Sequence, residues 1–387
     1  MSVTSAKGFV AAGVEAGIRH KKQDVALVCS TAPAVGGAMF TRNKVQAACV
    51  QLDRAHLSVA EPHAVVVNSG VANASTGAEG YANAEATAAK AAGLLGLATE
   101  QVLVLSTGVI GMHLPMDRLL SGVEKAHAAL SADGGHTAAE AIMTTDTKPK
   151  EATVSRDGFT VGGMAKGAGM IHPNLATMLS VITTDYPLEA GEPIAFLRPA
   201  IDDSFNAITI DGDCSTNDTV ILIANGESAI ERTAETDAAF VAALDEVCKD
   251  LSRQIVADGE GVTVLAEIHV SGAVDEPQAK AIAQRIATSM LVKTALFGHD
   301  ANWGRVMMAA GSAPFNGGYA DIDADKATLL YNDTVVLDAG EPTNVEPDVS
   351  GPSCTIKLEL GLGDGNAAYL TSDLSYDYVR INGDYRS

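Results

Sequence analysis

The sequence of 387 residues contains few basic and few aromatic residues, and both shortages argue against binding to nucleic acid. Lys and Arg total 26 against 48 Asp and Glu, a formal net charge of −22, and aromatic residues make up 4% of the chain. The longest uninterrupted run of Lys or Arg is the pair Lys21 and Lys22. Nucleic-acid binding needs a basic surface and often aromatic rings on which bases stack, so we expect no nucleic-acid partner. The excess of negative charge favours solubility.

The sequence also lacks the spacings that build disulfide frameworks and metal sites. Its five cysteines, at 29, 49, 214, 248 and 354, include no Cys-x-x-Cys pair, and its nine histidines are equally scattered. The acidic segment 211–218 lacks the glycine position and the distal glutamate of a standard calcium loop, so it is interpreted as a polar turn. We therefore expect neither a disulfide framework nor a metal site.

Long apolar runs are missing as well. No stretch of about 18 apolar residues occurs, and the N-terminus has no basic region followed by an apolar one. The sequence thus predicts a soluble cytoplasmic protein with no membrane partner.

The length and the periodicity predict an α+β protein of two lobes. A chain of this length exceeds the roughly 250–300 residues at which single cores stop growing. Groups of strands alternate with groups of helices rather than in strict strand–helix repeats, which is typical of α+β layering. The predicted helices are 78–95, 116–131, 136–143, 191–205, a helix ending near 257, and 276–291; the main predicted strands are 24–29, 37–41, 64–67, 101–105, 207–210, 262–270, 327–331, 333–338, 354–360 and 367–372.

The stretch 166–185 joins two unlike segments. Residues 166–174 contain two glycines and a Pro-Asn pair and are predicted to be a loop, whereas strand-like alternation begins at Thr177, directly after Ala176. A threonine whose preceding peptide bond is cut carries a free α-amine that can act as the base for its own hydroxyl. Strand-initial threonines are common, so this pattern alone favours an ordinary core strand.

The run Lys-Gly-Ala-Gly-Met-Ile-His-Pro-Asn-Leu-Ala-Thr-Met-Leu from Lys166 resembles the self-cleavage signature of the ornithine acetyltransferase family of arginine biosynthesis. The resemblance covers essentially the whole chain. Further blocks match in the family's order: Ser106–Gly111, Met143–Thr147, Asp211–Thr219, Asp258–Gly261, Asn302–Arg305 and Ile381–Ser387.

This resemblance implies a two-lobed αββα sandwich made as one precursor and cleaved between Ala176 and Thr177. Residues 1–176 would form an alpha chain that carries the oxyanion hole. Residues 177–387 would form a beta chain that begins with the threonine nucleophile. Two such pairs would assemble as an α2β2 complex.

The resemblance also implies an activity and a set of site residues. The enzyme would transfer acetyl from N2-acetyl-L-ornithine to L-glutamate through an acetyl-threonine, in a ping-pong reaction that needs no cofactor. Thr177 would be the nucleophile, and Thr107 and Gly108 would form the oxyanion hole. The substrate-binding residues would be Thr144, Lys166, Thr177, Glu260, Asn382 and Ser387.

These site assignments differ in what supports them. Without the resemblance, Thr107 and Gly108 form a turn at a strand end, and Glu260 is a solvated loop charge between two glycines. Alignment alone selects Thr144 over Thr145. Ser387 replaces a common terminal threonine but keeps a hydroxyl and a carboxylate.

Lys166 has a second possible role beside substrate binding, because a nearby ammonium disfavours protonation of the Thr177 amine and keeps it basic. His172, in the same loop, is assigned a packing role.

Other functions stay open at this point. An amidohydrolase or aminopeptidase with the same nucleophile would pass the acyl group to water, so added glutamate would not accelerate loss of N-acetylornithine. A non-catalytic acidic binding protein would run as one intact chain of 39.7 kDa. Acetyl-coenzyme A as an additional donor, which would make the enzyme bifunctional, is also left open by the sequence.

Overall fold

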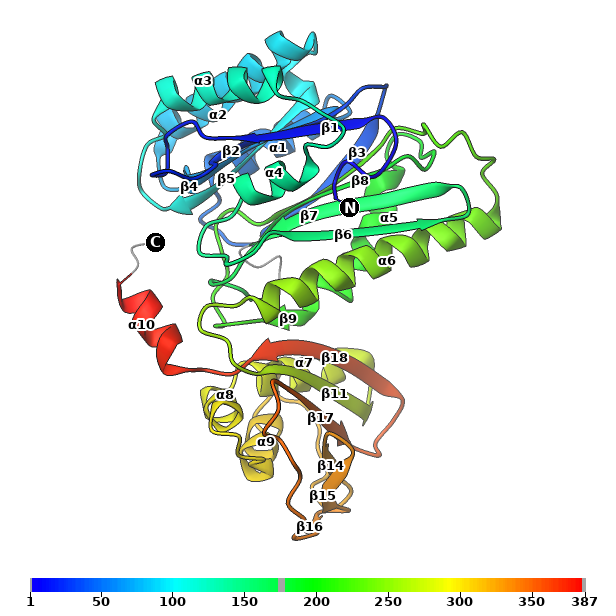
Figure 1. Cartoon of the computed structure of the whole chain (residues 1–387). Helices are drawn as coiled ribbons and strands as arrows, with labels where there is room; N and C mark the ends of the chain where they lie inside the picture. The colour runs from blue at the N-terminus through cyan, green and yellow to red at the C-terminus, as the bar shows by residue number, and fades with distance from the viewer. Residues whose placement is uncertain (1, 173–177, 385–387) are drawn as a thin grey trace. The chain divides into compact units, whose positions relative to one another are not determined.

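The structure is a computed structural model of the chain and describes residues 2–172 and 178–384 (Figure 1). The described residues form two compact units. The first comprises residues 2–206 and 213–255, and the second comprises residues 207–212 and 256–384.

The first unit contains a four-stranded sheet whose two faces pack against different partners. Its strands, in spatial order, are β1 (Phe9–Val14), β2 (Val25–Ser30), β4 (Ala64–Val71) and β5 (Val102–Val109). Side chains alternate between the faces, so Val66 packs against the helices while its neighbours Val65 and Val67 face the opposite way. The helices on the Val66 face are α1 (Ala48–Leu57), α2 (Gly77–Leu95) and α3 (Met116–Ala128). A 3₁₀ turn at Thr99–Gln101 precedes β5.

A five-stranded sheet lies against the other face of this first sheet. Its spatial order is β3 (Val35–Phe40), β10 (Thr219–Ala224), β8 (Leu179–Thr184), β7 (Phe159–Lys166) and β6 (Lys150–Arg156). Val181 and Ile221 from this sheet share one buried core with Val65 and Leu103, and α4 (Gly135–Ala141) packs at the edge of the same core.

Two helices cover the outer face of the five-stranded sheet: α5 (Glu192–Asp202) and α6 (Ala234–Ala257). Phe240 of α6 stacks on Tyr186 with ring centroids 4.6 Å apart, and Tyr186 meets Phe159 edge-on. The layers of the first unit are therefore helices, sheet, sheet and helices, as the αββα prediction stated.

The second unit is built on a seven-stranded mixed sheet. Its spatial order is β16 (Glu341–Pro342), β15 (Thr334–Asp338), β14 (Thr328–Tyr331), β17 (Ser353–Glu359), β11 (Leu265–Ala273), β18 (Gly365–Ser372) and β9 (Ile208–Thr209). The helices α7 (Glu276–Ala287), α8 (Met290–Phe297) and α9 (Trp303–Ala310) complete its apolar core. A short hairpin of β12 (Pro314–Phe315) and β13 (Gly318–Tyr319), a 3₁₀ turn at Phe205–Ala207 that leads into β9, and α10 (Tyr376–Asp384) are the remaining elements.

Two local predictions were wrong. Lys166 was placed in a loop, but it is the last residue of β7, where it pairs with Leu179. The single predicted helix 276–291 is two helices, because Ser289 caps α8 by accepting a hydrogen bond from the Val292 amide. The sequence analysis also missed α1 and the β6–β7 hairpin.

The compact units are not divided at Thr177, since β8 and β10 belong to the sheet that contains β7. The division into chains 1–176 and 177–387 concerns cleavage and stays a prediction. None of the helices in the described ranges is long and apolar enough to cross a membrane.

Candidate active site

The predicted oxyanion pair lies at the end of β5, in a backbone conformation that requires glycine. Gly108 has φ +134°, and a Cβ atom there would lie 2.2 Å from the carbonyl carbon of Gly70 on the neighbouring strand. The parallel register shifts at Val71, which is typical of a bulge that interrupts the ladder. Thr107 is buried directly before this glycine. Both residues belong to β5, so the turn that the sequence by itself indicated was wrong, and the irregular strand end places a buried threonine next to the Gly108 amide.

Asp146 organises a second group of predicted residues in the same unit. Its Oδ2 accepts hydrogen bonds from the Thr144 amide at 2.9 Å and from the Thr144 hydroxyl at 3.5 Å. Its Oδ1 accepts from Lys150 Nζ at 2.6 Å and from the Gly167 amide at 2.7 Å. Asp146 thus holds Thr144 close to Gly167, the residue that follows Lys166. Arg19 supports the same segment by donating to the Thr144 carbonyl at 2.9 Å.

The electrostatics of this group depend on two buried lysines. Burial alone would raise the pKa of the Asp146 carboxyl, but the positive charges of Lys166 and Lys150 hold that pKa well below its usual range. Lys166 is 2% exposed, and its charge also acts on the buried carboxyl of Asp218. Lys166 is therefore a buried cation near two carboxyl groups rather than a surface lysine.

His172 precedes the predicted cleavage region. Burial lowers the pKa of its imidazole, and the nearby Asp213 opposes this shift. A neutral ring is consistent with the predicted packing role, which stays a prediction.

Two predicted substrate-binding residues of the second unit contact each other. Asn382 Nδ2 donates to Glu260 Oε2 at 2.7 Å. Glu260 is 8% exposed, so it is not the solvated loop charge that its flanking residues indicated. Gly261 has φ +68°, and a Cβ atom there would lie 2.4 Å from the Tyr378 amide nitrogen, so this turn packs closely on α10.

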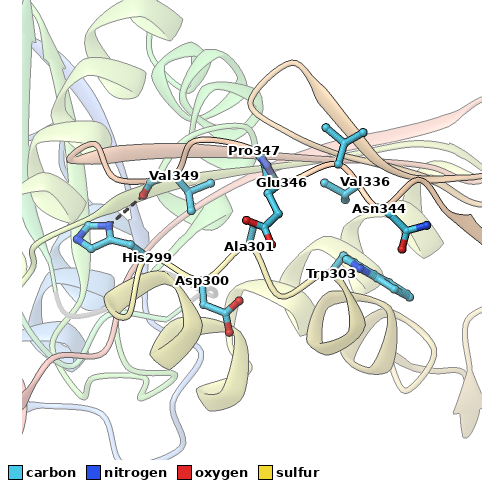
Figure 2. Close-up of a pocket in the computed structure, with 10 residues that line it drawn as sticks. His299, Asp300, Ala301, Trp303, Val336, Asn344, Glu346, Pro347 and Val349 are labelled. Atoms are coloured by element: carbon cyan, nitrogen blue, oxygen red, sulfur yellow. Dashed lines mark hydrogen bonds between the residues drawn. The ribbon is translucent and has the colours of Figure 1, made fainter.

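Figure 2 shows a pocket of about 630 Å³ in the second unit. The aromatic ring of Trp303 and the carboxylates of Asp300 and Glu346 line it, and beside it His299 Nδ1 donates a hydrogen bond to the Val349 carbonyl at 2.9 Å. None of the predicted site residues is among the residues that line this pocket. Its lining gives no support to the predicted acetyl-transfer site.

Three predicted residues, Ala176, Thr177 and Ser387, lie outside the described residues. Within residues 2–172 and 178–384, no group of three or more His, Cys, Asp or Glu side chains is arranged to hold a metal ion.

Comparison with known proteins identifies the family. The model of the ArgJ family matches residues 10–387. This chain belongs to the ArgJ family. The resemblance on which the sequence analysis rested is therefore confirmed.

Curated relatives match the chain from end to end. The arginine biosynthesis bifunctional protein ArgJ of Geobacter sulfurreducens is 45% identical over 98% of this chain and 99% of its own length. The protein of the same name from Mycolicibacterium paratuberculosis is 47% identical over 100% of this chain and 96% of its own length. A solved structure of ornithine acetyltransferase from Mycobacterium tuberculosis, complexed with ornithine, is 46% identical over 44% of this chain and 94% of that chain, with a TM-score of 0.43.

Sequence reasoning missed Asp146 as a member of the site. The residue lies inside the block Met143–Thr147 that matches the family. A single Asp after two threonines does not indicate that its carboxylate accepts four hydrogen bonds in the fold. No signal in the sequence marked it, because the burial of Lys150 and Lys166, which calls for a compensating anion, is set by the tertiary structure.

Proposed function

We propose that this chain transfers an acetyl group from N2-acetyl-L-ornithine to L-glutamate, through an acetyl-threonine formed on Thr177. The observation that carries the proposal is the alignment of nearly the whole chain with bifunctional ArgJ proteins at 45–47% identity. Membership of this family makes the chain an acetyltransferase of arginine biosynthesis.

The reaction consists of two half-reactions with one covalent intermediate. The Thr177 hydroxyl oxygen attacks the acetamide carbon, and the Thr177 α-amine takes the hydroxyl proton. The tetrahedral intermediate collapses when its carbon–nitrogen bond breaks, and the same proton passes to the departing ornithine amine. The glutamate amine then attacks the ester carbon and passes a proton to the Thr177 α-amine. When the bond to the threonine oxygen breaks, this proton passes to that oxygen, so N-acetylglutamate leaves and the Thr177 hydroxyl is restored.

The negative charge on the tetrahedral oxygen needs donors that are already in place. The Thr107 hydroxyl and the Gly108 amide are the proposed donors. Support comes from the position of Gly108, whose backbone lies so close to Gly70 that no larger residue fits. Each such donor typically contributes a few kcal/mol to the transition state.

Both substrates are amino acids, so the site needs charges of both signs. In the first unit, Lys166 is a buried cation and Thr144 is held by Asp146. In the second unit, Glu260 supplies a carboxylate that Asn382 orients. These four residues, with Thr177 and Ser387, are the proposed substrate-binding residues. The choice of Thr144 over Thr145 is part of the proposal.

The nucleophile requires processing of the precursor. Cleavage between Ala176 and Thr177 would give the alpha chain 1–176 and the beta chain 177–387. Because β7 and β8 are paired in one sheet, the two chains would remain associated after cleavage. We propose, as the family resemblance implies, that two such pairs form an α2β2 assembly.

The kinetic order tests the acetyl-threonine. Ornithine must leave before glutamate reacts, so double-reciprocal plots at several glutamate concentrations should be parallel. Incubation with N-acetylornithine alone should add one acetyl mass to the fragment that begins at Thr177, and glutamate should remove it. Intersecting plots with no acetylated fragment would show direct transfer instead.

Glutamate dependence separates this function from the hydrolase alternative. If the acyl group passes to water, N-acetylornithine is lost at the same rate with and without glutamate. The word "bifunctional" in the relatives' names favours a second activity, acetyl transfer from acetyl-coenzyme A to glutamate, which an assay with those two substrates measures directly.

A further inference from the structure

Two consecutive residues, Asn217 and Asp218, hydrogen-bond to two different strands of the first unit. They directly precede β10, and they are 4% and 0% exposed. Asn217 Nδ2 donates to the Ser106 carbonyl at 2.8 Å, in β5. Asp218 Oδ1 accepts from the Met178 amide at 3.1 Å, just before β8. Ser106 directly precedes Thr107, the first of the predicted oxyanion residues, and Met178 directly follows the predicted nucleophile Thr177.

The bond from Asn217 orients the peptide group between Ser106 and Thr107. The Ser106 carbonyl and the Thr107 amide belong to one planar peptide, so fixing the oxygen fixes the plane. The same Nδ2 donates to the Ala72 carbonyl at 2.6 Å, beyond the end of β4. One amide therefore ties together the backbone on both sides of the bulge next to Gly108.

The bond from Asp218 lies next to the proposed nucleophile in the sequence. Met178 directly follows the proposed nucleophile in the sequence, and Asp218 Oδ1 holds the Met178 backbone nitrogen. Asp218 Oδ2 is buried and accepts no hydrogen bond within the described part of the chain. Burial raises the pKa of this carboxyl, and the Met178 amide and the charge of Lys166 oppose the rise.

A buried carboxyl oxygen that accepts no hydrogen bond destabilises a fold, so the presence of Asp218 calls for a functional reason. The dipeptide is itself held firmly: the Asp218 carbonyl accepts from the Thr41 amide at 2.9 Å, and Asn217 Oδ1 accepts from the Thr216 hydroxyl at 2.5 Å. A fixed dipeptide that bonds to the Ser106 carbonyl in β5 and to the Met178 amide before β8 restrains the distance between these two backbone groups.

We propose that Asn217 and Asp218 are positioning residues that hold the proposed oxyanion residues Thr107 and Gly108, in β5, in register with the start of β8. This inference rests on the proposed acetyl transfer. It assigns a role to the block 211–219, which matches the family but has no role in the proposed reaction.

The test compares kcat and KM for Asn217→Ala, Asp218→Ala and Asp218→Asn, expressed per chain cleaved before Thr177 as counted by mass spectrometry. Because displacements of about 1 Å lower rates on the order of a hundredfold, both alanine variants should lose about that much in kcat with a much smaller change in KM. Asp218→Asn keeps an oxygen for the Met178 amide, so it should restore kcat to within a few-fold of the wild-type value.

Asn225 supplies a matched control at the opposite end of β10. Its Nδ2 donates to the Lys7 carbonyl at 3.0 Å and to the Ser30 hydroxyl at 3.2 Å, so Asn225→Ala removes a similar pair of bonds. It should keep the wild-type kcat. If Asn217→Ala and Asp218→Ala also keep it, the inference is wrong. If wild-type protein transfers no acetyl, the proposed function is wrong instead.

Should an alanine variant fail to fold, variants of nearly equal volume decide the question. Asn217→Asp replaces the donating amide by an oxygen that repels the carbonyls of Ser106 and Ala72, so it should lower kcat. A wild-type kcat would overturn the role of Asn217. A hundredfold loss in Asp218→Asn would overturn positioning through the Met178 amide, because that bond is retained.

Discussion

The buried pair of Asp146 and Lys150 makes a prediction about stability that follows directly from its geometry. The two side chains are fully buried, and Nζ lies 2.6 Å from Oδ1. Asp146→Asn keeps the volume but leaves the lysine charge without its partner. Breaking a buried pair in this way costs about 3–5 kcal/mol, so the free energy of unfolding should fall by about that amount at pH 7.

The dependence on pH has a definite sign. Lys166 and Lys150 hold the pKa of Asp146 below its usual range despite burial. A group of this kind contributes its full stability above its unfolded pKa of about 4, and the contribution is lost as the pH falls below that value. The difference between wild type and Asp146→Asn should therefore be largest near neutral pH and should shrink as the solution is acidified.

Asp245 and Lys249 form a matched control pair on α6. They have the same spacing of four residues and a similar Nζ to Oδ2 distance of 2.8 Å, but both side chains are partly exposed. Asp245→Asn should cost less than about 1 kcal/mol. Urea unfolding followed by circular dichroism measures all three proteins. An Asp146→Asn loss no greater than that of the control, or a difference that grows on acidification, would refute the reasoning.

Three further predictions concern the reaction. Thr177→Ala should remain a single chain in mass spectrometry, whereas wild type should yield a fragment beginning at Thr177; an intact wild type after long incubation would contradict self-cleavage. Thr107→Ala removes a donor needed mainly when charge develops on the carbonyl oxygen, so it should lower kcat by roughly a hundredfold or more with a smaller change in KM, and a change in KM alone would argue against an oxyanion role. Glu260→Gln and Asn382→Ala should act mainly on KM for the amino-acid substrates, and steady-state kinetics that show only a loss of kcat would remove both from the binding site.

The sequence by itself predicted most local structure, because helices and strands follow from patterns within a few turns of chain. The alanine-rich segment 78–95 and the observed helix α2 nearly coincide, and the alternating segment after Thr177 contains β8. The β6–β7 hairpin was missed because Gly162 and Gly163 weaken the strand pattern. The motifs were also sufficient to identify the family.

The tertiary structure alone decided which side chains meet. Asn217 bonds to Ser106 across 111 positions, and Asp146 receives the Gly167 amide across 21. Glu260 and Asn382 are likewise separated by 122 positions, although each was named from its own motif. Such contacts leave no periodicity in the sequence, since they depend on which distant segments the fold of each unit brings together rather than on neighbouring residues. Burial has the same origin: a lysine at position 166 has the same local sequence signal whether it is solvated or 2% exposed, and only the packing of two sheets makes it a buried cation.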